Sequence, residues 1–321
     1  MKTKPADIIY SPLDVSSLGQ EYLAWKRDHK EFGLPFFSKK MRDKVYPLFP
    51  GEVLSIIARP GHAKTSVMML WARQRARWLK ENRQEKRAVI YATWEQSIEE
   101  LHSFYLAAEQ GISITKMAKG DLHEEDWKKV EQGTADRVNE PLWFVGHSMV
   151  RRSGRKPITV ETLAQAIEKI QNFGDGFDVD SVYVDYLQRI HPVGGFENPV
   201  MAYTQIMTDL KNFALGFGVP MVVGVQASRE VEELKVQIPE MHHAQWTSNI
   251  EQTSDRVLSL VRPRRYRKEG EMFGSHKVEG QSQLLVNVVK QKLGEANFAE
   301  WLKFNPIYNK LDDNELFYGG V

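Results

Sequence analysis

Short hydrophobic runs recur along the chain, separated by longer stretches with helical periodicity. The runs are rich in Val, Ile and aromatic residues and nearly continuous, and they lie at 53–58, 88–93, 142–147, 181–187 and 219–225. Continuous runs of this kind are typical of strands buried on both faces. Helices are expected between them, at 64–82, 97–109, 160–173 and 203–217. This alternation predicts a parallel sheet with helical crossovers.

The pattern changes after residue 255. RVLSLV, QLLVNVVKQ and FAEWLKF have the character of strands, and no helical pattern separates them. Strands joined without crossover helices pair in antiparallel fashion. We therefore expect one α/β domain over residues 34–321, with a mostly parallel central sheet flanked by helices and antiparallel strands at its C-terminal edge.

The N-terminal arm, residues 1–33, carries a single amphipathic pattern in the stretch SSLGQEYLAWKRDHKEF. Ser17 has a glutamine three residues later, which is the spacing of a capping box, and Leu18, Tyr22 and Trp25 fall on one face. One helix cannot bury its own apolar face. We expect the arm to dock on the main domain or on another subunit.

Composition sets a few limits on function. The net charge is +1, so any nucleic-acid site must be a local patch. The chain has no cysteine, which excludes a disulfide framework and cysteine-based metal sites. Its apolar runs are too short to span a bilayer, and its first residues lack the apolar core of a secretory signal. These features favour a cytoplasmic location and no membrane partner.

The stretch IIARPGHAKTSVMML reads as a strand, a turn and a helix that begins at Lys64 and Thr65. This context suits the phosphate-binding pattern G-x-x-x-x-G-K-[ST], although alanines occupy both glycine positions, at Ala58 and Ala63. Lys64 would reach the β- and γ-phosphates of ATP, and Thr65 would bind Mg²⁺. Ala63 is the harder departure, because a glycine there permits a positive φ. The alternative is a helix that merely starts with Lys-Thr. The expected nucleotide-binding residues are Arg59, Pro60, Gly61, His62, Ala63, Lys64, Thr65 and Ser66.

Polar residues follow three other predicted strands. Asp185 ends an apolar strand and suits a carboxylate that holds Mg²⁺, but Tyr186 follows it, so the catalytic base must come from elsewhere. Glu95 lies just past another strand end and could orient or deprotonate the attacking water. Gln226 could sense a γ-phosphate, and Arg229 could serve the site or the surface. Each residue could instead cap a turn or a helix.

Together these stretches resemble the helicase domain of DnaB-type replicative helicases, within the RecA-like P-loop ATPases, over about residues 34–305. The family's ARPxxGKT, SLEM, IDYLQ and VPVIxLSQLxR resemble ARPGHAKT, TWEQ, VDYLQ and VPMVVGVQASR here. Its SIEQDADxVLFL and KQRNG resemble NIEQTSDRVLSL and KQKLG. The matches DYLQ, which contains Gln188, and IEQ-x3-D-x-VL are the most specific.

The resemblance implies a RecA-like fold in a homohexameric ring that hydrolyses ATP between subunits and translocates 5′ to 3′ on single-stranded DNA during replication. Glu95, Lys64, Gln226, Lys290 and Lys292 would be its catalytic residues. Lys292 stands where the family has an arginine that reaches the neighbouring site, and loses that residue's planar fork. The helix of each arm would pack on a neighbouring subunit. We expect no N-terminal collar domain, the part that family members use for primase contact.

Four residues are candidates for DNA contact. Two loops are candidates by position: 191–203, which follows the Asp185 strand and is rich in Gly and Pro, and 241–249, which precedes the IEQ motif at a position that resembles the family's channel loop. The four candidate residues, which could bind phosphate or stack on bases, are Lys211, His242, His243 and Trp246. Trp246 could equally be a packing residue, and the His pair has no acidic partner at the spacing of a metal site.

A dense basic run, RPRRYRK at 262–268, could bind a DNA backbone, contact an adjacent subunit's nucleotide or form a solvated turn. The solvated turn or a subunit interface is favoured over recognition of bases. Binding to DNA should therefore be led by its backbone and depend on salt.

The sequence thus favours an ATP-dependent DNA helicase of a bacterium, or of a phage or mobile element in a bacterial host, with a primase or loader as a further partner. Two alternatives stay open: a nucleotide- and DNA-binding ring with little turnover, and a RecA-like ATPase of recombination or signalling.

Overall fold

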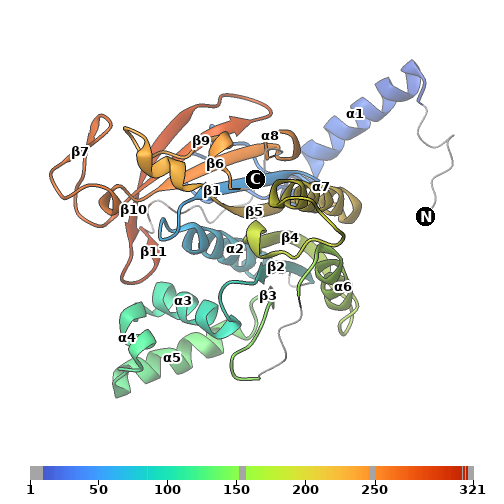
Figure 1. Cartoon of the computed structure of the whole chain (residues 1–321). Helices are drawn as coiled ribbons and strands as arrows, with labels where there is room; N and C mark the ends of the chain where they lie inside the picture. Colours follow the sequence, from blue (N-terminus) through green and yellow to red (C-terminus); the bar gives the residue numbers. More distant parts are fainter. Residues whose placement is uncertain are drawn as a thin grey trace.

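The computed structural model describes residues 10–84, 86–151, 157–245, 250–312, 314 and 316. A nine-stranded sheet forms its centre, in the order β11-β10-β9-β6-β1-β5-β4-β2-β3, and Figure 1 shows it between layers of helices. The sheet strands are β1 (Val53–Ala58), β2 (Arg87–Thr93), β3 (Leu142–Val145), β4 (Asp178–Asp185), β5 (Met221–Gln226), β6 (Arg256–Val261), β9 (Gln283–Gln291), β10 (Phe298–Asn305) and β11 (Lys310–Leu311). A separate hairpin pairs β7 (Met272–Phe273) with β8 (His276–Lys277).

The sheet has the predicted mixture of directions. Strands β1 to β6 pair in parallel, whereas β9 is antiparallel to β6 and β10 antiparallel to β9. The α/β fold expected from the sequence is therefore confirmed. The parallel strands place their carboxyl ends at one edge, where ligands of open α/β sheets bind.

Helices cover both faces of the sheet (Figure 1). The α-helices are α1 (Pro12–Asp28), α2 (Lys64–Glu81), α3 (Ile98–Gln110), α4 (Ile114–Lys119), α5 (Glu124–Arg137), α6 (Val160–Gln171), α7 (Pro199–Phe217) and α8 (Ile250–Thr253). Short 3-10 turns are η2 (Lys30–Phe32), η3 (Leu187–Arg189), η4 (Arg229–Glu233), η5 (Met241–His243) and η6 (Pro263–Arg265). Among the described residues, none of the helices combines the length and the hydropathy needed to cross a membrane.

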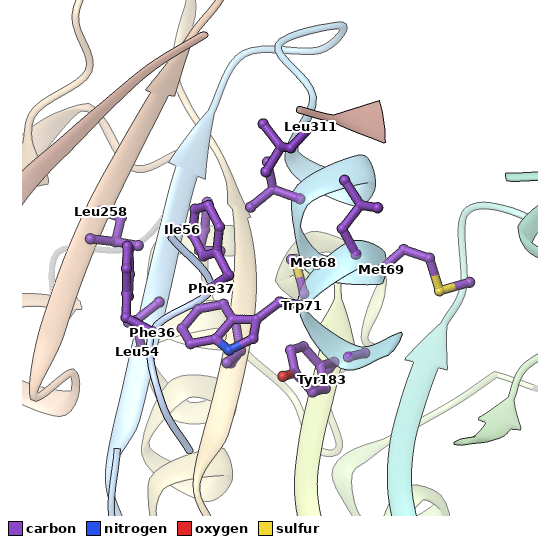
Figure 2. Close-up of a cluster of buried hydrophobic side chains, with 14 of the residues drawn as sticks. Phe36, Phe37, Leu54, Ile56, Met68, Met69, Trp71, Tyr183, Leu258 and Leu311 are labelled. Atoms are coloured by element: carbon purple, nitrogen blue, oxygen red, sulfur yellow. The ribbon is translucent and has the colours of Figure 1, made fainter. Parts of the chain in front are cut away.

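The core beside α2 also holds the segment that precedes β1. Trp71 of α2 packs against Phe36 and Phe37, with ring centroids 5.3 Å away in both cases, and Figure 2 shows it between that segment and Tyr183. The Trp71 indole donates to the carbonyl of Pro35 at 2.8 Å. The chain before the first strand is therefore part of the domain core and fixes α2, the helix that follows the predicted phosphate-binding loop at 59–63, which we call the phosphate loop.

Helix α1 differs from the sequence prediction at its start. The capping box is formed by Ser11 and Asp14, not by Ser17, and Pro12 occupies the first helical turn. Ser17 lies inside the helix. An aspartate at the third position satisfies the cap as well as a glutamine does, and proline is favoured at the first position, so the earlier start is chemically reasonable. No residue of α1 is buried, and the helix projects from the body of the domain (Figure 1).

Candidate functional site

The loop after β1 turns tightly before α2. Gly61 has a φ of 79°, and Ala63 has a φ of 66° and a ψ of 21°, in the left-handed region. An alanine thus adopts the backbone conformation expected of a glycine, at a cost of roughly 1–2 kcal/mol. No described side chain caps α2. The N–H groups of its first turn can therefore point at an anion.

Lys64, Asp185 and Tyr186 meet beneath this loop. The Lys64 Nζ lies 3.8 Å from the Asp185 carboxylate and 3.7 Å from the centroid of the Tyr186 ring. Burial lowers the pKa of Lys64, while the charge of Asp185 raises it. Asp185 is fully buried and accepts a hydrogen bond from the Tyr91 hydroxyl at 3.0 Å.

One oxygen of this carboxylate has no hydrogen bond among the described residues. The Asp185 Oδ1 is buried and unpartnered apart from the nearby charge of Lys64. The Thr65 hydroxyl lies at the start of the same cleft. Hard oxygen atoms of this kind suit Mg²⁺, which keeps most of its waters and takes one or two protein ligands.

A cleft of about 260 Å³ opens above these groups. Its lining comes from the phosphate loop, from the segments after β2, β4 and β5, and from the C-terminal strands: Ala58, Arg59, Pro60, Gly61, Ala63, Lys64, Thr65, Ser66, Glu95, Gln96, Phe104, Tyr186, Gln226, Arg262, Phe304, Pro306 and Asn309. The parallel sheet therefore brings Glu95, Gln226 and the loop together.

Glu95 is the carboxylate that can act on a water in the cleft. Burial raises its pKa, and the charge of Lys64 lowers it. Glu95 is exposed and lines the cleft, so its carboxylate is placed to accept a proton from a water held against a phosphate. The Glu95 side chain comes from the turn between β2 and α3, where Ser97 begins the helix with its own capping box.

The basic run lies on the phosphate loop of its own subunit, and not only in solvent. The backbone N–H of Arg262 donates to Nδ1 of His62 at 3.0 Å, and the ring of Tyr266 lies 5.0 Å from that of His62. The Arg262 side chain donates to the carbonyl of Gly61 at 3.3 Å. Arg265 also approaches the loop closely, since a Cβ on Gly61 would lie 3.2 Å from its guanidinium. The run thus fixes the loop.

His62 should make the protein less stable in acid. Burial first, and then the charges of Arg265, Arg262 and Arg59, lower its pKa from 6.5 to about 3. The unfolded chain takes up a proton as the pH falls below 6.5 while the folded chain does not, so stability is lost across this window by about 1.4 kcal/mol per pH unit. Urea unfolding from pH 7 to 4 measures this loss. His62→Asn keeps a neutral acceptor for Arg262, so its stability should fall less steeply; parallel curves would contradict the assignment.

Lys290 and Lys292 lie at the other end of the sheet. Gln291 between them pairs with Arg256 at the start of β6, whereas Ala58 beside the phosphate loop pairs with Leu260 near its end. At about 3.3 Å per residue, these positions are well over 10 Å apart. Lys290 donates to the backbone carbonyls of Glu251 in α8 and Ser254 just after it, and Lys292 is 3.5 Å from Asp255. Neither lysine can reach the cleft of its own subunit.

The DNA candidates have different surroundings. Lys211 donates to Asp255 at 2.6 Å and to the Gly51 carbonyl at 2.8 Å, so its positive charge is paired with a carboxylate of its own subunit. His243 is buried, and its ring accepts from the backbone N–H of Glu240. His242 is exposed. No group of metal-binding side chains occurs among the described residues, and Trp246 lies outside them.

Gly224 is a site residue that the sequence reasoning missed. A Cβ on this β5 residue would lie 3.1 Å from the Lys64 side chain and 3.3 Å from Asp185. Gly224→Ala should therefore displace the Lys64 amine and weaken ATP binding by about tenfold, which is about 1.4 kcal/mol. Calorimetric titration with an ATP analogue measures the change. Gly216→Ala, in open space on α7, is the matched control; equal affinities would contradict this role. A glycine inside a buried strand was the available signal.

Asn309 was also missed, and Arg262 was considered only as part of the basic run, for DNA, an adjacent subunit or solvent and not for its own cleft. Asn309 accepts a hydrogen bond from the Ser66 hydroxyl, and it comes from the turn between β10 and β11. Residues so distant in sequence reach the cleft only through the order of the C-terminal strands, which no local pattern reveals.

Comparison with known proteins gives one family. Residues 33–313 match the family described as the DnaB-like helicase C terminal domain. The chain is 25% identical over 304 residues to replicative DNA helicase DnaB of Rickettsia felis, covering 92% of this chain and 55% of the relative. It is 27% identical over 260 residues to replicative DNA helicase DnaC of Bacillus subtilis, covering 81% and 52%. The chain thus spans about half the length of the curated relatives it matches.

Two solved structures share the fold. One is a DnaB-like replicative helicase studied with its interactions with primase, with a TM-score of 0.76 and 20% identity over 95% of this chain and 67% of that one. The other is an ATPase domain, with a TM-score of 0.76 and 21% identity over 92% of this chain and 96% of that one.

Proposed function

The chain belongs to the DnaB-like helicase C terminal domain family, and we propose that it is an ATP-driven DNA helicase that translocates on single-stranded DNA as a hexameric ring. The observation that supports this most is the convergence of Lys64, Glu95 and Gln226 on one cleft, with the buried Asp185 carboxylate 3.8 Å from the Lys64 amine, because together they supply the groups that ATP hydrolysis needs. The replicative helicases among its relatives favour a role in replication, in the bacterial cytoplasm.

In this proposal the residues of the cleft exchange partners when ATP binds. Lys64 leaves Asp185 for the β- and γ-phosphates, and α2 presents its free N–H groups to the same oxygens. Mg²⁺ would be held by Thr65 and, through its hydration shell, by Asp185, and would neutralise phosphate charge. Glu95 then accepts the proton of the attacking water, and the Gln226 amide contacts the γ-phosphate.

The remaining charge near the γ-phosphate would come from the neighbouring subunit. Lys292 is 69% exposed and lies far from its own cleft, so it can serve only another copy. In a ring with heterologous contacts, the face of one subunit meets the opposite face of the next. A residue on the face away from its own cleft can therefore reach the cleft of a neighbouring subunit. Lys290 would support the segment after α8 on that same face.

The arm would hold the ring together. Leu18 and Tyr22 of α1 are 46% and 53% exposed, although they form an apolar face. A groove of about 670 Å³ lies on the bundle of α3, α4 and α5, lined by Leu106, Met117 and Trp127 among others. We propose that the apolar face of α1 from one subunit fills the α3–α5 groove of the next.

Tyr22→Asp should therefore break the ring without unfolding the subunit. A charge on the apolar face opposes burial in the groove, whereas the exposed side chain adds nothing to the subunit core. Size-exclusion chromatography with light scattering, with Mg²⁺ and an ATP analogue, should show a shift from hexamer to smaller species. Gln20→Asp adds the same charge to the other side of α1 and should leave the hexamer intact. A hexamer in both variants would contradict the docking.

Helicase action is tested on a forked duplex. With ATP and Mg²⁺, the protein should separate a duplex with a 5′ single-stranded tail, and high salt should weaken its binding to the DNA. Assembly on DNA and ATP hydrolysis without strand separation would favour a RecA-like ATPase of another pathway.

A second candidate is a nucleotide-binding ring with little turnover. Ala63 is held in the left-handed region, and Lys292 lacks the planar guanidinium that stabilises phosphoryl transfer well. Tight ATP binding with no hydrolysis, even with DNA, would support this alternative.

A further inference from the structure

Three glutamines from separate elements form a closed ring of hydrogen bonds beside the cleft. The backbone N–H of Gln226 donates to Oε1 of Gln188 at 3.1 Å, and Nε2 of Gln188 donates to the carbonyl of Gln245 at 2.9 Å. The backbone N–H of Gln245 donates to the carbonyl of Gln226 at 2.9 Å, which closes the ring. Each residue is therefore held by the other two, and we call the three residues the glutamine ring.

The glutamine ring joins three parts of the molecule. Gln226 ends β5 and lines the nucleotide cleft. Gln188 lies in η3, three residues after Asp185. Gln245 is the last described residue of the stretch that begins at η5. His243 of that stretch accepts, through its carbonyl, a hydrogen bond from the backbone N–H of Ser228 at 2.7 Å. The ring thus connects the phosphate end of the cleft to one of the two segments considered for DNA contact.

Gln188 also reaches the other segment considered for DNA contact. Its backbone carbonyl accepts a hydrogen bond from the Tyr203 hydroxyl at 3.0 Å. Tyr203 lies in the first turns of α7, the helix that follows the loop after residue 190. A single residue therefore contacts the end of β5, the stretch before residue 246 and the start of α7.

Only one orientation of the Gln188 amide satisfies both side-chain contacts. Its oxygen must face the N–H of Gln226 and its nitrogen the carbonyl of Gln245, because the reversed amide would set donor against donor and acceptor against acceptor. Movement of the Gln226 backbone therefore shifts the Gln245 backbone by two routes: the direct hydrogen bond between them and the two bonds of the Gln188 amide.

We propose that Gln188 is a positioning residue that couples the nucleotide state of the cleft to DNA binding by the stretch 241–245. When the Gln226 amide turns to a γ-phosphate, the glutamine ring transmits the shift of its backbone to Gln245. DNA bound at that stretch sends the reverse signal, since coupling between two sites is reciprocal. This inference rests on the proposed function, because it requires hydrolysis that responds to DNA.

Gln188→Glu tests the coupling with the smallest change. The carboxylate keeps the shape of the side chain and still accepts from Gln226, but it cannot donate to the Gln245 carbonyl. Support of the cleft is thus retained, and only the bond towards the DNA segment is lost. Gln188→Ala removes both bonds. Gln165→Glu makes the same substitution on the exposed face of α6 and is the matched control.

Two measurements are made on each variant of the whole 321-residue chain after its thermal unfolding confirms the fold. The first is ATP hydrolysis with Mg²⁺, with and without a single-stranded oligonucleotide. The second is the Kd for that oligonucleotide, with and without a non-hydrolysable ATP analogue. For Gln188→Glu we expect hydrolysis without DNA within about twofold of the unmodified chain, stimulation by DNA reduced at least about fivefold, and a Kd for DNA that the analogue hardly changes. Gln165→Glu should match the unmodified chain throughout.

The outcomes separate this inference from the proposed function. Equal loss of hydrolysis with and without DNA in Gln188→Glu would mean that Gln188 only supports the cleft, and would overturn the coupling. Full DNA stimulation in both Gln188 variants would overturn it as well, while leaving the proposed function intact. An unmodified chain that hydrolyses ATP without any response to DNA would refute the proposed function and the inference with it.

Discussion

Replacement of Glu95 with glutamine should reduce ATP hydrolysis by about 10²–10⁴-fold, the usual contribution of a general base. Glutamine fills the same space and can still form hydrogen bonds, but it cannot accept the proton of the attacking water. Burial raises the pKa of Glu95 and the nearby charge of Lys64 lowers it, so the two effects oppose one another and the group remains a usable base. ATP binding should survive, because Lys64 and the loop are unchanged.

The measurement pairs steady-state hydrolysis with binding of an ATP analogue. Glu168→Gln, on the exposed surface of α6, makes the same chemical change away from the cleft and should keep normal turnover. Lys64→Ala should lose binding as well as turnover, which distinguishes the phosphate contact from the base. Turnover by Glu95→Gln within a few fold of the unmodified chain would exclude Glu95 as the base.

Removal of the Asp180 carboxylate should destabilise the fold by about 3–5 kcal/mol. Asp180 is fully buried on β4 and binds two arginines: Arg75 of α2 at 2.8 Å and Arg87 of β2 at 2.6 Å. Both guanidinium groups also donate to the carbonyl of Glu31 in η2. Without the carboxylate, the two buried cations would lose the one counter-charge that both of them contact.

Urea unfolding followed by circular dichroism measures this loss for Asp180→Ala, and for Asp180→Asn in case the alanine variant does not fold. Asp178, exposed at the start of the same strand, supplies the control: Asp178→Ala should cost less than about 1 kcal/mol. A similarly small loss for both Asp180 variants would show that the buried cluster is not needed. Because the cluster joins η2 to the sheet, its loss should also loosen the attachment of the arm, which contains α1.

The strands were predictable because strands buried on both faces have continuous apolar sequences. The stretch 53–58 is β1, and the other four runs overlap β2 to β5 to within three residues at each end. The start of α7 was less visible, since the predicted loop to residue 203 includes the first turn of a helix that Asn198 caps and Pro199 begins. Local signals of capping existed, but the apolar pattern begins later.

Helices α4 and α5 had no such pattern. Helix α5 is strongly charged and has a single buried position, Gly133, which lies against α3. Its helical state depends on capping by Asp126 and on packing against α3, and neither produces a recognisable apolar stripe. The helical structure of α4 and α5 therefore depends on tertiary contacts.

The cleft was predictable in part for a similar reason. The end of a parallel strand marks where a polar residue will point, which identified Glu95, Asp185 and Gln226 from the sequence. Arg262 and Asn309 enter the cleft from the turns after β6 and β10, and their position there depends on the order of strands across the sheet. The glutamine ring depends on atomic directions that a sequence does not contain.

We propose that this cleft hydrolyses ATP in response to DNA, despite the alanine before Lys64. The most direct test is the rate of phosphate release by the unmodified chain with ATP and Mg²⁺, before and after addition of single-stranded DNA, with Glu95→Gln as the blank. We predict a rate well above that of Glu95→Gln, which rises when DNA is added and disappears when Mg²⁺ is chelated. Firm binding of ATP with a rate no greater than that of Glu95→Gln, with or without DNA, would contradict it.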